Sequence, residues 1–94
     1  MQARVVFMGT PEFAVPSLEA LANRIGDGEL LVVTQPDRAA GRGRKLQPPP
    51  VRVAADRLSL PVVQVATLRD AEIRQRLETF APDLIIVAAF GLLL

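Results

Sequence analysis

Four cationic side chains stand within eight residues of one another, and their types and spacing are suited to holding phosphate. They are Arg38, Arg42, Arg44 and Lys45. A guanidinium group binds phosphate oxygens in a bidentate manner, and a Lys ammonium adds a point charge. Gly41 and Gly43 lie between them, and glycine lets the backbone approach a ligand closely. The pattern favours phosphate binding, with RNA or DNA as the ligand, over a plain solvated surface loop.

The stretch that carries these cations, residues 34–50, reads TQPDRAAGRGRKLQPPP. Its glycines and prolines predict neither a helix nor a central strand. A connection between secondary-structure elements usually has about 4–6 residues, and a much longer one is usually functional or disordered. No aromatic residue lies between the cations, so base stacking is not indicated. We expect a long basic loop that meets a partner.

A second candidate is the turn formed by residues 9–13, GTPEF, which follows an apolar run. If it opens a helix, free backbone N–H groups there could receive a substrate. The simpler interpretation, a tight strand-to-helix turn, is the one we favour from these residues alone. The turn lacks the glycines of a dinucleotide-binding fingerprint, and the chain has no phosphate-binding Gly-Lys-Ser/Thr loop.

A third candidate is Phe90–Gly91 with the leucines that follow, which could line an apolar slot for a flat heterocycle. Core packing with a turn glycine is the simpler interpretation. Asp37 and Glu12 are the only acids near these candidates, and they form no acid–base pair. The chain has no histidine and no cysteine, and we expect no metal site.

Composition limits the other possibilities. The 94 residues carry a net charge of +1 and are 50% hydrophobic, which predicts a globular chain without a global charge field. The N-terminus lacks the apolar core of a signal peptide, and the longest apolar run, Leu84–Leu94, is about half of a membrane span. We therefore predict a cytoplasmic protein.

Strands and helices alternate along the chain. Apolar runs predict strands at residues 4–8, 29–33, 62–65 and 84–89. Helical spacing predicts three helices, whose apolar faces are Ala14, Leu18, Leu21 and Ile25; Val51, Ala54, Ala55 and Leu58; and Ile73, Leu77 and Phe80. Thr10 is expected to cap the first helix, with Pro11 at its first position. Thr67 and Asp70 resemble a capping box for the third.

This alternation predicts an α/β fold: a Rossmann-like open parallel sheet with helices on both faces and the strand order 3-2-1-4. Ligands of such sheets bind at the carboxyl ends of the strands, at the switch point between strands one and four. The last strand is apolar on both faces, which predicts covering layers on both sides. We therefore expect residues 1–94 to be one partial domain, of about four strands, from a larger protein.

Four blocks of sequence carry a specific resemblance: VVFMGTPEFAVPSL at 5–18, VTQPDR at 33–38, GRGRKLQP at 41–48 and PDLIIVAAFG at 82–91. Together they resemble the first part of the catalytic domain of the methionyl-tRNA formyltransferase family. The resemblance implies formyl transfer from 10-formyltetrahydrofolate, a co-substrate, to the methionine amino group of initiator methionyl-tRNA in translation initiation. It also implies a longer, monomeric enzyme that continues with the rest of this domain and a C-terminal β-barrel domain.

The same resemblance implies roles for particular residues. The family's catalytic Asn, His and Asp fall beyond Leu94, so no catalytic residue is assigned here. The tRNA-binding residues would be Arg38, Arg42, Arg44 and Lys45. The folate-binding residues would be Phe90, Gly91, Leu92 and Leu93. The residues facing the methionyl end of the substrate would be Gly9, Thr10 and Phe13.

Two other functions stay open. One is a different folate-dependent formyltransferase that acts on a small amine or a sugar nucleotide, although a small substrate gives no reason for an arginine-rich loop. The other is a non-catalytic nucleic-acid-binding α/β module, which would bind unrelated RNA with a steep salt dependence.

Overall fold

A four-stranded parallel sheet organises the chain, as seen in a computed structural model that describes residues 3–25, 29–40, 43 and 45–88. The strands are β1 (Val5–Gly9), β2 (Leu30–Thr34), β5 (Val62–Gln64) and β6 (Leu84–Ala88). The helices are the short 3₁₀ helix η1 (Glu12–Ala14), α1 (Val15–Arg24), α2 (Pro50–Arg57) and α3 (Ala71–Phe80). A separate two-stranded antiparallel ribbon is formed by β3 (Arg38–Ala40) and β4 (Lys45–Gln47).

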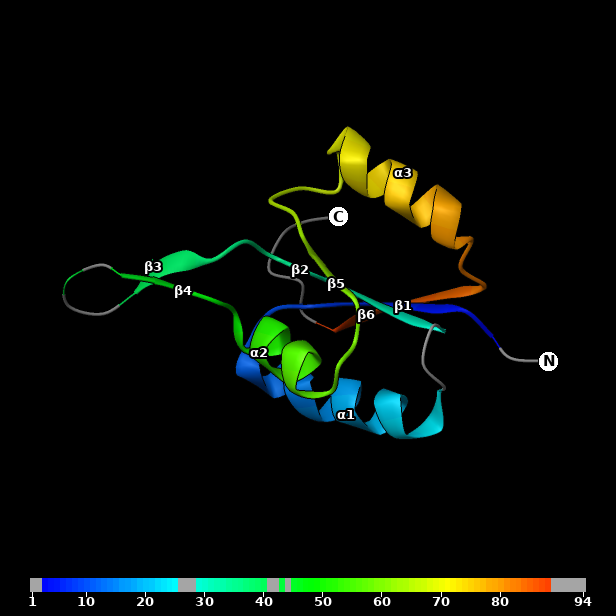
Figure 1. Ribbon diagram of the computed structural model, residues 1–94, viewed down its shortest axis with the longest axis horizontal. Helices are drawn as coiled ribbons and strands as arrows, with labels where there is room; N and C mark the ends of the chain where they lie inside the picture. Colours follow the sequence, from blue (N-terminus) through cyan, green and yellow to red (C-terminus); the bar gives the residue numbers. More distant parts are fainter. Residues whose placement is uncertain (1–2, 26–28, 41–42, 44, 89–94) are drawn as a thin grey trace.

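The spatial order of the sheet is β5-β2-β1-β6. Counted along the chain without the ribbon, this is the predicted order 3-2-1-4, and the predicted fold class is confirmed. Helices α1 and α2 lie on one side of the sheet and α3 on the other (Figure 1). The connections from β1 and from β5 therefore leave on opposite faces, and the switch point lies between β1 and β6.

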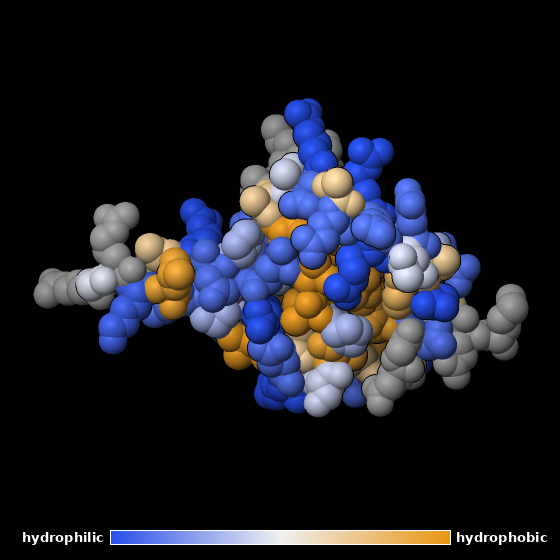
Figure 2. Space-filling model, turned by 45° about the horizontal axis from the view of Figure 1, so that its top comes forward, coloured by the Kyte–Doolittle hydropathy of each residue, from blue (hydrophilic) through white to orange (hydrophobic). Residues whose placement is uncertain are grey.

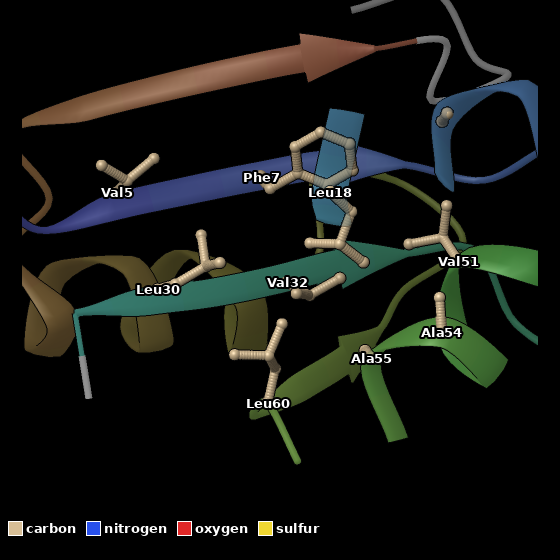
Figure 3. Close-up of a cluster of buried hydrophobic side chains, with 10 residues drawn as sticks. Val5, Phe7, Leu18, Leu30, Val32, Val51, Ala54, Ala55 and Leu60 are labelled. Carbon is tan, nitrogen blue, oxygen red and sulfur yellow. The ribbon is translucent and has the colours of Figure 1, made fainter. Parts of the chain in front are cut away.

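Alternate residues of the two central strands feed two separate cores. Val5 and Phe7 of β1 and Leu30 and Val32 of β2 pack with Leu18 of α1 and with the buried face of α2 (Figure 3). Intervening residues such as Val6 and Met8 pack with Ile73 of α3 on the other face. Because both faces of these strands are covered, they are apolar throughout, as is typical of parallel sheets.

Two local expectations at helix starts are wrong. Pro11, not Thr10, precedes the first helical turn, which is the 3₁₀ helix η1 without a side-chain cap. The Thr10 side chain is engaged elsewhere, because its Oγ1 accepts a hydrogen bond from Thr34 Oγ1 at 3.4 Å, and its carbonyl oxygen accepts one from the Val51 N–H at 3.3 Å. Asp70 is itself the cap of α3, accepting from the Glu72 N–H at 2.8 Å, so it does not form a box with Thr67.

The last strand differs from the buried strand that the sequence predicts. Leu84 is 53% exposed, and Ile85 and Val87 are each 46% exposed. The strand lies at the edge of the described sheet, and α3 covers β1 and β2 rather than β6. The described residues therefore do not supply both of the covering layers that its apolar composition requires.

Candidate nucleic-acid interface

The basic stretch begins at the carboxyl end of β2 and forms a ribbon that projects from the body of the molecule (Figure 1). Arg38 pairs with Gln47, and Ala39 pairs with Leu46. The sequence predicts a loop without a central strand, and the structure instead has two three-residue strands in a sheet of their own. Gly43, with φ of 83°, lies in the turn between them, where a positive φ favours glycine.

The register gives the ribbon two unlike faces. Side chains of paired residues, and of residues two apart on one strand, lie on the same face. Arg38 and Lys45 therefore share one face with Gln47, and Leu46 shares the other with Ala39. Leu46 is 70% exposed, and hydrophobic and hydrophilic surfaces adjoin on the arm at the left of Figure 2. Two of the four predicted cations thus lie diagonally across one exposed face of the ribbon, which can follow a phosphate backbone.

Arg42 and Arg44, the other two predicted cations, lie outside the described residues. Within the part of the chain that the structure describes, neither Arg38 nor Lys45 forms an ion pair with a carboxylate. Cations without such partners are available to a polyanion. The two arginines of α2 differ in this respect, since Arg52 pairs with Asp56 at 3.0 Å and Arg57 with Glu19 at 2.7 Å.

The base of the ribbon is held by a polar cluster that the sequence interpretation missed. Gln64, at the carboxyl end of β5, donates from Nε2 to the Gln35 carbonyl oxygen at 3.1 Å and to Asp37 Oδ1 at 2.7 Å. Its Oε1 accepts a hydrogen bond from Arg52 of α2. In the sequence, the one indication of this cluster is that Gln64 is a polar residue near the end of an apolar strand, at the edge of the sheet where ligands are expected to bind.

The turn predicted to face the substrate lies at the same edge. Thr34 Oγ1 at the end of β2 donates to Thr10 Oγ1 at 3.4 Å, so the two hydroxyl groups adjoin at this rim. Phe13 is 72% exposed in η1. Gly9 is buried and closely surrounded: a Cβ there would lie 2.9 Å from Phe7 Cε2 and 3.0 Å from the Ala88 carbonyl oxygen. Close packing is therefore sufficient to require glycine at this position.

A hollow of about 360 Å³ separates the base of the ribbon from η1. Its apolar part comes from Val15 of α1 and from Val53 and Ala54 of α2, with Pro48 and Pro50 beside them. Glu12 and Arg57 give it one charge of each sign.

The residues predicted to line a folate pocket, Phe90, Gly91, Leu92 and Leu93, lie outside the described residues. Within residues 3–88, as far as the structure describes them, no group of three or more His, Cys, Asp or Glu side chains is placed to hold a metal ion. No helix in this described part has the length and hydrophobicity that a membrane span requires.

Fold and sequence together define the class. The sequence profile of the formyl transferase family matches residues 3–94, and the chain belongs to that family. Among its relatives is the methionyl-tRNA formyltransferase of Geotalea uraniireducens, 50% identical over 91 residues, which are 97% of this chain and 29% of the relative. The enzymes of the same name from Pelotomaculum thermopropionicum and Methylococcus capsulatus are both 54% identical, over 94% and 97% of this chain. The chain therefore spans less than a third of the length of these curated relatives.

Proposed function

We propose that this chain is the N-terminal part of the catalytic domain of a methionyl-tRNA formyltransferase. In this proposal the complete enzyme transfers a formyl group from 10-formyltetrahydrofolate to the methionine amino group of initiator methionyl-tRNA in the cytoplasm. The observation that carries it is the exposed pair of cations, Arg38 and Lys45, on a ribbon that projects from a formyl transferase fold. A small substrate would need no such arm.

In this proposal each part of the substrates is bound by a different segment of the chain. The ribbon contacts phosphates of the tRNA, as do Arg42 and Arg44, which follow β3 and precede β4 in the sequence. Gly9, Thr10 and Phe13, at the carboxyl end of β1, face the methionyl end, and residues 90–93 line the folate pocket. The amine attacks the formyl carbon, the new C–N bond replaces the bond to the folate nitrogen, and the proton that the amine loses is balanced by the proton that the departing folate nitrogen gains. The groups that catalyse this step belong to the rest of the enzyme, as does the proposed C-terminal β-barrel domain, and the complete enzyme is proposed to act as a monomer.

The test is a comparison of substrates in the full-length protein. Replacing both cations, Arg38→Ala with Lys45→Ala, should raise KM for initiator tRNA by about tenfold for each lost charged hydrogen bond and leave KM for the formyl donor unchanged. Lys45→Arg should retain tRNA use, because it keeps the charge. Arg74→Ala with Arg76→Ala on α3, which removes two exposed cations at a distance from the ribbon, is the matched control.

The outcomes separate the proposal from its two alternatives. Unchanged kinetics for tRNA in the double variant, with turnover of a small amine or a sugar nucleotide, would identify a different formyltransferase. Tight binding of unrelated RNA by the full-length protein, with a steep salt slope and no formyl transfer, would identify a non-catalytic nucleic-acid-binding module.

A second experiment concerns the chain by itself. The 94-residue chain should show no formyl transfer to methionyl-tRNA, because the proposed catalytic residues are not within it. Turnover near that of a complete enzyme, measured with labelled formyl donor, would refute this assignment of the catalytic residues.

A further inference from the structure

The side-chain amide of Gln64 joins three segments that are distant in the sequence. It holds residues 35–37, which lead into the ribbon, through its two donated hydrogen bonds of 3.1 and 2.7 Å. It holds α2 through the hydrogen bond that it accepts from Arg52. Its own backbone is fixed in the sheet, where Gln64 pairs with Thr34. One side chain therefore ties the base of the ribbon to both the sheet and the helix layer.

Every polar group of this amide is in use. The two N–H groups meet two oxygen acceptors, and the single oxygen meets a guanidinium donor. A flipped amide would place its oxygen against two oxygens and its NH₂ against the guanidinium, so the orientation is determined. A Glu at this position would have no donor for the ribbon, and a Lys would have no acceptor for Arg52. Among side chains of this length, only Gln satisfies all three partners.

The bond to Asp37 lies directly beside the cationic face. Asp37 is the residue before Arg38, the first residue of β3. A free carboxylate at that place would repel a phosphate that approaches Arg38. The hydrogen bond to Gln64 fixes the position of this carboxylate against β5 and, with it, the direction in which the chain runs from β2 into β3.

The anchor on the other side, Arg52, has a second partner in its own helix. Arg52 also donates from Nε to Asp56 Oδ2 at 3.0 Å, within the same helix. The helix is packed on the sheet through its buried residues Val51, Ala54 and Ala55. The ribbon itself pairs with no strand of the main sheet. The direction of the ribbon consequently depends on the contacts at its base, which include the hydrogen bonds of Gln64.

We propose that Gln64 is a positioning residue that sets the direction of the basic ribbon, so that Arg38 and Lys45 meet the phosphates of the tRNA. This inference rests on the proposed function for its last step, whereas the effect on the ribbon is independent of that function. In this proposal Gln64 acts through the ribbon, to whose base it is hydrogen-bonded, and has no part in the chemical step.

The first experiment measures the ribbon directly in this chain, diluted with an excess of unlabelled chain so that only distances within one molecule contribute. The sequence has no cysteine, so Leu46→Cys and Val53→Cys, both at exposed positions, allow specific spin labelling of β4 and α2. In this labelled background, Gln64→Met removes the three hydrogen bonds, and Gln64→Glu keeps the bond from Arg52 but repels Asp37. Both should broaden the distance distribution between the labels. An unchanged distribution in both variants would overturn the inference.

A reciprocal exchange provides the rescue. In Gln64→Glu with Asp37→Asn, the new Asn donates to the new Glu, and the net charge equals that of the original chain. The distribution should narrow again towards the original width. Gln75→Glu, an exposed change on α3 that adds the same single charge as Gln64→Glu, is the matched control and should leave the width unchanged. A double variant as broad as Gln64→Glu would exclude the bond to Asp37 as the positioning contact.

The second experiment measures kinetics in the full-length protein. Gln64→Met should raise KM for initiator tRNA by about tenfold, the effect of one charged hydrogen bond, and leave kcat and KM for the formyl donor unchanged. The exchange with Asp37 should recover part of this loss. If the Arg38 and Lys45 variants impair tRNA use and Gln64→Met does not, the inference fails and the proposed function stands. If neither impairs it, the proposed function itself fails.

Discussion

At the level of single residues, the glycine at position 9 has two possible explanations, a packing requirement of the fold and a role in the candidate site. The sequence interpretation left a substrate role open beside a plain turn, and the packing decides what the fold requires. A Cβ at Gly9 would meet the buried Phe7 ring, the Ala88 carbonyl oxygen and Ala14 Cβ at 2.9, 3.0 and 3.1 Å. Two of these neighbours are a core side chain and a backbone atom of the adjacent strand, which cannot move cheaply.

Gly9→Ala should therefore lower the free energy of unfolding by about 1–3 kcal/mol, the usual cost of overpacking a core. Urea denaturation followed by circular dichroism would show a lower midpoint with an unchanged m-value. Gly43→Ala is the informative control, because a Cβ there meets nothing within 4 Å although φ is 83°. The Cβ added by Gly43→Ala at this left-handed φ should strain the ribbon by about 1–2 kcal/mol and leave the packing of the main sheet unchanged. A Gly9→Ala midpoint equal to the original one would contradict the packing argument.

At the element scale, α3 shows how local chemistry determines a helix and its ends. Asp70 caps the start with its own side chain, and Ala81 ends the helix in the left-handed conformation, with φ of 53° and ψ of 63°. Glycine is the usual residue at such a C-terminal position, because a Cβ is strained there. The start of α3 is thus stabilised by a side-chain cap, whereas its end has a residue in a strained backbone conformation.

Asp70→Ala should destabilise the chain by about 1 kcal/mol, the usual value of an N-cap hydrogen bond. Ala81→Gly should stabilise it by a similar amount, about 1 kcal/mol, because it removes the left-handed strain. Both changes are at exposed positions, and thermal unfolding of the two variants and of their combination measures them. A lower melting temperature for Ala81→Gly would show that backbone entropy outweighs the strain at this position.

The ribbon is the element that the sequence could indicate only in part. Cations and glycines predicted a surface that meets phosphate, but three-residue strands flanked by prolines have too few alternations to reveal a period of two. The two unlike faces depend on the pairing of Ala39 with Leu46, which is a property of the register rather than of either segment. The contact between Gln64 and Asp37 spans 27 positions and was likewise invisible. By contrast, the sheet order followed from long apolar runs, whose period and connections leave few alternatives.

At the scale of the whole molecule, the two edges of the main sheet differ. At β5 the edge is short, with three residues that are all partly buried. At β6 the edge has five apolar residues, and three of them are 46–53% exposed. A long apolar edge strand can pair with the strand of another molecule and is a site of association. Ile85 and Val87 point to the same face, the one that α3 leaves uncovered.

The 94-residue chain by itself should therefore self-associate through β6 as its concentration rises. Val87→Lys, alone or with Ile85→Lys, should shift sedimentation velocity profiles towards the monomer, because a lysine at an exposed edge opposes pairing of strands. Leu46→Lys, at a position of the ribbon that is 70% exposed, adds the same charge away from β6 and should leave the association unchanged. An original chain that remains monomeric at all concentrations, or an equal effect of Leu46→Lys, would show that the exposed strand is not the associating surface. The exposed edge at β6 would then be rejected as the cause of self-association.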